Sequence, residues 1–139
     1  MVNPELINER LREMRANILL LEEFNIIPFD KFNADPKTIK ATEHCLQLSI
    51  QCILDIGHHI VVDNDWPRPN DNKEMILVLG QKGIFPIDFA NRIVPMVGFR
   101  NILVHEYLKI DTKQLYSHLQ YLQDFREFQK HIIAYLKSP

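Results

Sequence analysis

Glycine is scarce in this 139-residue chain, which has only four, and the alternating runs of Val, Ile and Thr that would predict β-strands are absent. We find no uninterrupted apolar run near the ~20 residues that a helix needs to cross a bilayer. The charged first residues also lack the apolar segment of a secretory signal. These absences argue against a sheet protein, a membrane protein and an exported protein. They predict an all-α protein of the cytoplasm.

Cysteine is also scarce, and neither sign of charge dominates. Cys45 and Cys52 are seven residues apart on one predicted helix, hence ~10 Å apart, which is too far for a disulfide between them. Free thiols suit a reducing compartment. With 16 basic and 18 acidic residues the formal net charge is −2, so the chain as a whole is not that of a basic nucleic-acid-binding protein. Any contact with RNA must come from a local basic cleft.

What is present predicts one helical domain over residues 1–139. Apolar residues make up 46% and charged residues 24%, which is ordinary for a globular domain. Capping residues followed by proline, and prolines or loop residues between apolar stripes, set the expected boundaries. We predict a bundle of about five helices: Pro4 to before Pro28, Pro36 to about Val62, about Asp71 to Gln81, Pro86 to about Ile110, and one after Asp111. Residues 29–34 and 63–72 are predicted to be connections.

Apolar residues at helical spacing mark the buried face of each predicted helix. The expected core comprises Ile7, Leu11, Met14, Ile18, Leu21, Ile39, Leu46, Ile50, Ile53, Ile60, Val61, Met75, Ile76, Leu79, Phe89, Ile93, Met96 or Val97, Leu115, Leu119, Leu122, Phe125, Ile132 and Leu136. We expect Trp66 to cover this core and His118 and His131 to lie on the surface. Pro95 removes one helical hydrogen bond and should kink its helix without ending it.

Two polar clusters have simple structural interpretations. Arg10, Arg12 and Arg15 mostly avoid the apolar face of the first helix, and we interpret them as a solvated flank rather than as phosphate contacts. Asp55, His58, His59 and Asp63 could suggest a metal site. However, adjacent histidines diverge by ~100° on a helix, and no metal-binding spacing is present. We therefore predict no metal there, and a hydrogen bond from Asp55 to His58 or His59.

The window that carries chemistry is Gly98-Phe99-Arg100-Asn101-Ile102-Leu103-Val104-His105-Glu106-Tyr107. Arg100 and Tyr107 lie almost in line on a helix, two turns apart, and Asn101 and His105 form a second line beside them. Arg100 and His105 are ~140° apart, so a long arginine side chain or a second copy of the helix would have to bring them to one site.

This window resembles the Arg-x4-His-x-Tyr signature of the HepT toxins, members of the HEPN superfamily of all-helical ribonucleases. The flanking Gly98, Asn101 and Leu-Val pair fit the family as well, and the resemblance covers nearly the whole chain. It implies a HEPN-like fold and a homodimer in which two signatures face one cleft. It also implies metal-independent endonucleolytic cleavage of RNA that leaves a 2′,3′-cyclic phosphate, with no cofactor.

The residue types fit that chemistry. Cleavage needs a base for the 2′-hydroxyl proton and a cation for the charge that builds on the phosphate. Imidazole is mostly neutral at pH 7, so His105 is the expected base. Arg100 can direct two donors at phosphate oxygens, and Asn101 could orient His105 or donate to the phosphate.

The resemblance also implies a partner. HepT-like toxins pair with a minimal nucleotidyltransferase antitoxin, which transfers AMP from ATP to the tyrosine at the position of Tyr107. The added phosphate would offset the charge of Arg100 and block the RNA path. One alternative is a non-catalytic helical dimer that binds a nucleotidyltransferase or presents substrate to it. Another is a nucleotide-binding regulatory module, although no Gly-rich phosphate loop supports it.

Overall fold

The computed structural model of the chain describes residues 3–106 and 110–138, which form seven helices and no β-strand. The helices are α1 (Pro4–Phe24), α2 (Phe29–Asn33), α3 (Pro36–Asp63), α4 (Asn72–Gln81), α5 (Ile87–His105), α6 (Thr112–Leu119) and α7 (Gln123–Lys137). The expected helical starts are confirmed. The side chains of Asn3, Asp35 and Asp111 accept backbone N–H groups at the starts of α1, α3 and α6, which satisfies donors that a helix leaves free.

The prediction of about five helices was too low. Residues 29–34, expected to be a connection, contain the single turn α2, whose Phe32 is fully buried. The last expected helix is broken into α6 and α7 at residues 120–122. The buried Leu115, Leu119, Leu122 and Phe125 keep helical spacing across this break, so the apolar periodicity could not reveal it.

Two expected helix ends also differ. The first helix ends at Phe24, four residues before Pro28, and Asn25 caps it by donating to the Leu21 carbonyl. The helix with the signature window ends at His105, and Glu106 is its C-cap. The helix continues through Pro95, as predicted. The expected turn at residues 107–109 lies outside the described residues.

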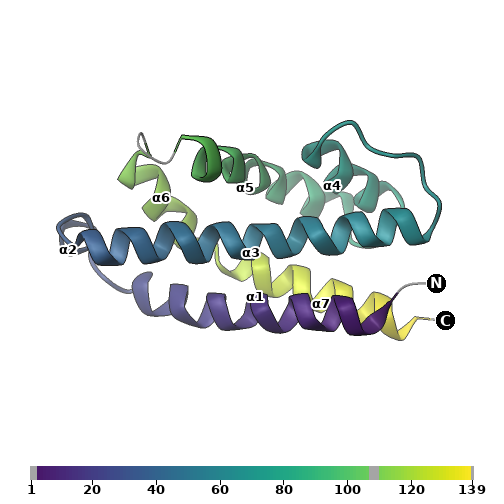
Figure 1. Cartoon of the computed structure of the whole chain (residues 1–139), viewed down its shortest axis with the longest axis horizontal. Helices are drawn as coiled ribbons and strands as arrows, with labels where there is room; N and C mark the ends of the chain where they lie inside the picture. Colours follow the sequence, from purple (N-terminus) through teal and green to yellow (C-terminus); the bar gives the residue numbers. More distant parts are fainter. Residues whose placement is uncertain (1–2, 107–109, 139) are drawn as a thin grey trace.

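The helices are stacked around α3, which is the central element. The helices α4 and α5 lie on one side of it, and α1 and α7 lie on the other (Figure 1). The start of α1 and the end of α7 are side by side at one end of the molecule, whereas α5 ends at the opposite end (Figure 1). In length and composition α3 could also span a membrane, but 61% of its most apolar stretch is buried by the other helices. Such burial is typical of a core helix.

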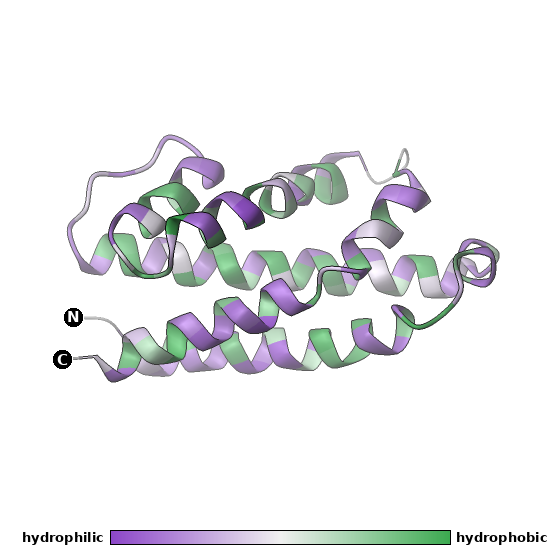
Figure 2. Cartoon of the chain, turned by 180° about the vertical axis from the view of Figure 1, so that it is seen from behind, coloured by the Kyte–Doolittle hydropathy of each residue, from purple (hydrophilic) through white to green (hydrophobic). Residues whose placement is uncertain are grey.

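The expected core is confirmed at nearly every position. Ile39 and Leu136 are only partly buried and pack at its edge, and so does Trp66, as predicted. Apolar and polar residues alternate along each helix as its faces turn toward and away from the centre (Figure 2). The two cysteines are free and buried; burial raises the pKa of the Cys52 thiol to about 12. They therefore behave as small apolar side chains.

Candidate active site

The last two turns of α5 carry Arg100, Asn101 and His105, the three predicted site residues that the structure describes. The buried Phe99 and Leu103 anchor this segment to the core. Asn101 and His105, four residues apart, are both exposed, while Arg100 is half-buried on the side that faces α3. Within the described residues, no side-chain hydrogen bond joins Arg100, Asn101 and His105 to one another. The helix therefore offers the amide and imidazole to solvent and holds the guanidinium at its flank.

Arg100 belongs to a chain of hydrogen bonds across three helices. Its terminal Nη2 donates to Gln51 Oε1 at 3.0 Å, and Gln51 Nε2 donates to Asp55 Oδ1 at 2.8 Å. Asp55 Oδ2 accepts from Arg10 Nε at 3.1 Å. We call these four residues the relay. The sequence interpretation missed Gln51, because only the packing of α3 against α5 brings it to Arg100, 49 residues away.

The charges in the relay alternate. Arg10 lies within 4 Å of three carboxylates, those of Asp55, Glu9 (3.8 Å) and Glu13 (3.9 Å). Its hydrogen bond with Asp55 raises the pKa of Arg10 above its usual value. Because Asp55 is directed toward Arg10 and Gln51, the group that touches Arg100 is a neutral amide. Arg100 keeps its full positive charge, uncompensated by a described carboxylate contact.

Arg100 also has donors to spare. A guanidinium carries five N–H groups, and among the described residues only Gln51 accepts one from Arg100. Its Nε is buried without a hydrogen-bond partner in the described structure. A buried donor without an acceptor costs ~1–3 kcal/mol. The Arg100 side chain is therefore held by one described hydrogen bond and has N–H groups left for an anion.

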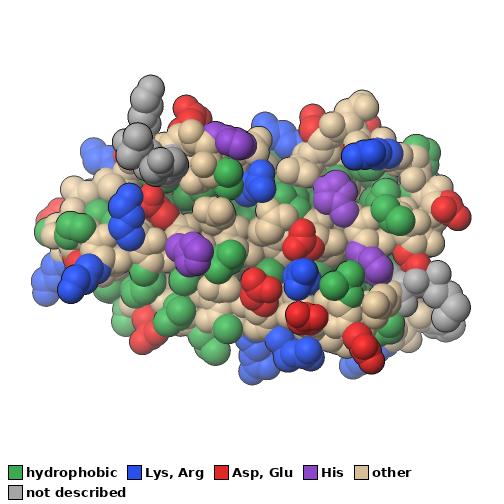
Figure 3. Space-filling view, viewed as in Figure 1, with side chains coloured by type: hydrophobic (Ala, Val, Ile, Leu, Met, Phe, Trp, Pro, Cys, Tyr) green, Lys and Arg blue, Asp and Glu red, His purple; other side chains and the backbone are tan. Residues whose placement is uncertain are grey.

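A polar hollow lies beside Asn101, between α5 and the start of α4. Its volume is about 360 Å³, and its lining includes Lys73, Gly98 and Asn101. A Cβ atom at Gly98 would lie 2.9 Å from Lys73 Cε, so the glycine lets the lysine side chain lie across α5. Lys73 is a second cation near the signature window, and the sequence interpretation did not identify it. The face over α1, α3 and α5 mixes acidic, basic and histidine side chains (Figure 3).

The predicted pairing of Asp55 with His58 or His59 was wrong. The Asp55 carboxylate instead accepts hydrogen bonds from Gln51 and from Arg10 of α1, whose positive charge strengthens the interaction. His59 Nε2 accepts the backbone N–H of Asn3 at 2.9 Å, and His58 contacts Asn72 at 3.3 Å. The two imidazoles thus point to different helices. Among the described side chains, no group of His, Cys, Asp and Glu is arranged to hold a metal ion.

Two further expectations concern side chains beyond this helix. Tyr107, the expected site of AMP transfer, lies outside the described residues. His118 and His131 were predicted to be surface residues, which was wrong. His118 is half-buried and its ring stacks on Phe99 at 4.3 Å, and burial lowers the pKa of its imidazole. His131 is also half-buried and packs on Phe89 at 5.2 Å.

Comparisons with known proteins show the family to which the chain is related. A family model described as "Ribonuclease HepT-like" matches residues 14–132, which include the whole signature window. A protein of Aphanizomenon flos-aquae named tRNA nuclease HepT is 31% identical over 136 residues, covering 97% of this chain and 92% of its own. A protein of Shewanella oneidensis named mRNA nuclease HepT is 27% identical over 84 residues, 60% of this chain and 63% of its own.

Solved structures share the fold. YutE, a cytosolic protein of unknown function from Bacillus subtilis, superposes with a TM-score of 0.87 at 20% identity, covering 98% of this chain and 92% of its own. The tri-AMPylated HEPN toxin of Shewanella oneidensis, solved in complex with its MNT antitoxin, gives a TM-score of 0.83 at 22% identity, covering 93% and 97%.

Proposed function

Because this chain belongs to the family of HepT-like ribonucleases, we propose that it is the endoribonuclease toxin of a toxin–antitoxin pair and that Arg100 and His105 carry the cleavage. The observation that supports these residues most directly is their placement on α5. Asn101 and His105 are exposed on one line of the helix, and Gln51 holds the guanidinium of Arg100 at its flank. The names of the two curated relatives, a tRNA nuclease and an mRNA nuclease, make transfer RNA and messenger RNA the first substrates to test.

The proposed reaction needs no metal ion. The imidazole of His105 takes the proton of a ribose 2′-hydroxyl, whose oxygen then attacks the adjacent phosphorus. The bond from phosphorus to the 5′-oxygen breaks, so the products are a 2′,3′-cyclic phosphate and a 5′-hydroxyl that has taken up a proton. Arg100 stabilises the negative charge on the phosphate oxygens, with Asn101 as a further donor.

The proposed site is shared by two protomers. Arg100 and His105 diverge by ~140° on an ideal helix, and one cation with one imidazole is a small complement for a polyanion. A two-fold axis beside the end of α5 would bring two copies of each to one cleft. The exposure of Asn101 and His105 leaves that part of α5 open to a second copy. Light scattering should therefore give the mass of a dimer; an active monomer would contradict this arrangement.

The test of catalysis is to incubate the protein with total RNA in the presence of EDTA, beside His105→Ala and Arg100→Ala. Loss of a positioned base lowers the rate by ~10²–10⁴-fold. His44→Ala is the matched control, because His44 is exposed on α3 and its side chain makes no described hydrogen bond. Circular dichroism should show the same helix content in all variants. Cleavage by His105→Ala at the wild-type rate would reject the assignment.

The proposed antitoxin is a minimal nucleotidyltransferase that modifies Tyr107. The tyrosine oxygen would bond to the α-phosphorus of ATP as pyrophosphate leaves and the hydroxyl proton is lost. The AMPylated Shewanella toxin in complex with its MNT antitoxin supports this proposal, because it has the same fold. The adduct would place a negative phosphate seven residues from Arg100 along the chain and oppose its charge.

Mass spectrometry of the protein after incubation with the transferase, ATP and magnesium tests this regulation. We expect the adduct on the Tyr107 peptide, with loss of nuclease activity. Tyr107→Phe should prevent both effects, and Tyr121→Phe is the matched control because Tyr121 is 62% exposed. Tyr116 and Tyr135 are poorer acceptors, since both are half-buried and their hydroxyls bond to Ile27 and Asn64. An adduct on Tyr121 alone would refute the assignment.

The proposal also places the protein in the cytoplasm. Its two cysteines are free and buried, which suits a reducing compartment. Its proposed substrate and its proposed partner are cytoplasmic molecules as well.

A further inference from the structure

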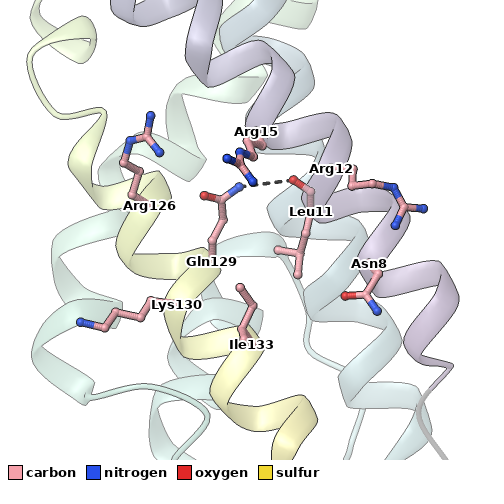
Figure 4. A pocket seen from close by; sticks show the side chains of 8 residues that line it. All are labelled: Asn8, Leu11, Arg12, Arg15, Arg126, Gln129, Lys130 and Ile133. Carbon is pink, nitrogen blue, oxygen red and sulfur yellow. Dashed lines mark hydrogen bonds between the residues drawn. The ribbon is translucent and has the colours of Figure 1, made fainter.

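A second basic surface lies between α1 and α7, away from the signature window. A groove of about 460 Å³ runs between these two helices, and four of its eight lining residues are cations. Arg12 and Arg15 come from α1, and Arg126 and Lys130 come from α7. No carboxylate lines it. In Figure 4, Arg15 extends over the groove beside Gln129, while Arg12 and Lys130 reach outward from its opposite rims.

The packing of α7 on α1 fixes this arrangement. Gln129 Nε2 donates to the backbone carbonyl of Leu11 at 3.3 Å, which joins the two helices at the groove (Figure 4). Leu11 is buried beneath it. Residues three and four apart share a helix face, so each helix brings its pair of cations to one rim. The groove is therefore built from two fixed helices.

Ion pairing separates the cations of this region into two kinds. Arg10, on the other side of α1, is compensated by Asp55, Glu9 and Glu13. Arg126 is held by both carboxylate oxygens of Glu22, one of them at 2.9 Å from Arg126 Nε.

The other three groove cations are unpaired: among the described residues, no ion pair involves Arg12, Arg15 or Lys130. The groove thus concentrates three uncompensated positive charges in a chain whose net charge is −2.

A second copy of this chain is a poor occupant. A two-fold interface sets the same surface patch against itself, so the cations of one groove would face those of the other and repel. An anion is the fitting ligand. Guanidinium groups bind phosphate oxygens through paired N–H donors, and three of the four cations here are arginines.

We propose that the groove between α1 and α7 is a second RNA-binding surface, which holds backbone phosphates of the substrate outside the segment that is cut. This inference rests on the proposed ribonuclease function. Among the described residues, the cations identified at the α5 site are Arg100 and Lys73, whereas RNA carries a phosphate at every nucleotide. The groove and α5 lie on opposite sides of α3 (Figure 1), so the RNA that uses both must be long or folded. Arg12 and Arg15 are exposed, as the sequence predicted. The sequence analysis interpreted them as solvated residues, whereas in this proposal they contact phosphates.

The experiment measures RNA affinity against salt concentration. The triple variant Arg12→Gln, Arg15→Gln, Lys130→Gln is made in the His105→Ala background, so that RNA is not consumed. The control is Lys31→Gln, Lys37→Gln, Lys40→Gln, which removes the same charge from exposed positions on α2 and α3. The probe is fluorescein-labelled, unfractionated transfer RNA, followed by anisotropy over a series of KCl concentrations.

Each phosphate contact adds about 0.7 to the slope of log affinity against log salt for a single strand and about 0.9 for a duplex, so the loss of three cations should lower the slope by about 2 to 3. The same relation predicts an affinity at 0.1 M salt that is lower by roughly 100-fold or more. The control should keep the slope of the parent protein. Light scattering and thermal unfolding of each variant show that mass and fold are unchanged.

Equal affinities and slopes for the groove variant and its parent would overturn the proposal. So would the absence of RNA binding by the parent protein. If the groove variant instead loses its dimer mass or its binding to the nucleotidyltransferase, with RNA affinity unchanged, the groove is a protein interface and the proposal is again wrong. Groove-dependent RNA binding by a wild-type protein that cleaves no RNA would support the groove and refute the proposed function.

Discussion

Gln51→Ala should disable Arg100 without touching the residues proposed to act on RNA. The substitution removes the acceptor of Arg100 Nη2 at 3.0 Å and the donor to Asp55 Oδ1 at 2.8 Å. A hydrogen bond to a charged group contributes ~1.5–3 kcal/mol, so two such bonds at the low end would contribute about 3 kcal/mol. Gln51, Arg100 and Asp55 are all half-buried, and water screens part of the interaction, so we expect the two bonds together to contribute about 2 kcal/mol.

That loss of stability should lower the melting temperature by about 6 °C for a chain of this length. The effect on catalysis follows from position. Once Gln51 is removed, the guanidinium has no described partner to hold it, and a misplacement of about 1 Å can lower the rate by ~10²-fold. We therefore expect kcat to fall by about 10- to 100-fold and KM to change little, measured on transfer RNA well below both melting temperatures.

Gln47→Ala is the matched control. Gln47 lies one turn earlier on the same helix, is half-buried, and its side chain makes no described hydrogen bond. Gln51→Glu tests whether the acceptor must be a neutral amide. A carboxylate can still accept from Arg100, but it pairs with the charge that Arg100 would offer to a phosphate, and it repels Asp55 instead of donating to it. Both kcat and the melting temperature of Gln51→Glu should therefore stay below those of the wild type. If Gln51→Ala matches Gln47→Ala in both melting temperature and kcat, the relay does not position Arg100.

Two further predictions concern the core. Burial lowers the pKa of the His118 imidazole, so the unfolded chain binds more protons than the folded chain as the pH falls below ~6.5. The free energy of unfolding should therefore decrease as the pH is lowered from 6.5, which urea unfolding between pH 7.5 and 5.5 would show. His118→Phe keeps an aromatic ring on Phe99 and should reduce this pH dependence. Gly57→Ala would set a Cβ atom 2.8 Å from Met75 Cε inside the core, where overpacking costs ~1–3 kcal/mol against ~1 kcal/mol gained in helix propensity. A small net loss of stability in urea unfolding is expected, and a gain would show that Met75 moves aside freely.

Local signals explain why much of the fold was predictable. A capping side chain and the apolar stripe of one helix depend on residues within a few positions, so Asn3, Asp35 and Asp111 marked true helix starts. The break between α6 and α7 was missed because the buried Leu119 and Leu122 keep their spacing across it. The turn α2 is five residues long, too short for any periodicity to show.

The candidate site was only partly predictable. The signature window predicted Arg100, Asn101 and His105 as site residues, because all three lie close together in the sequence. Gln51 and Lys73 come from other helices, and only packing brings them to α5. The failed pairing of Asp55 has the same origin, since its partner Arg10 is 45 residues away. His118 was misjudged because its neighbour Phe99 belongs to another helix.

The placement of the chain ends has a practical consequence. The start of α1 and the end of α7 lie together, and His105 ends α5 at the opposite end of the molecule (Figure 1). An affinity tag or a fused domain at either terminus would therefore lie away from the proposed site. A short linker could also join the two ends, with new ends opened in the loop between α3 and α4. Such a circular permutant would retain every helix, as chains with adjacent termini often do.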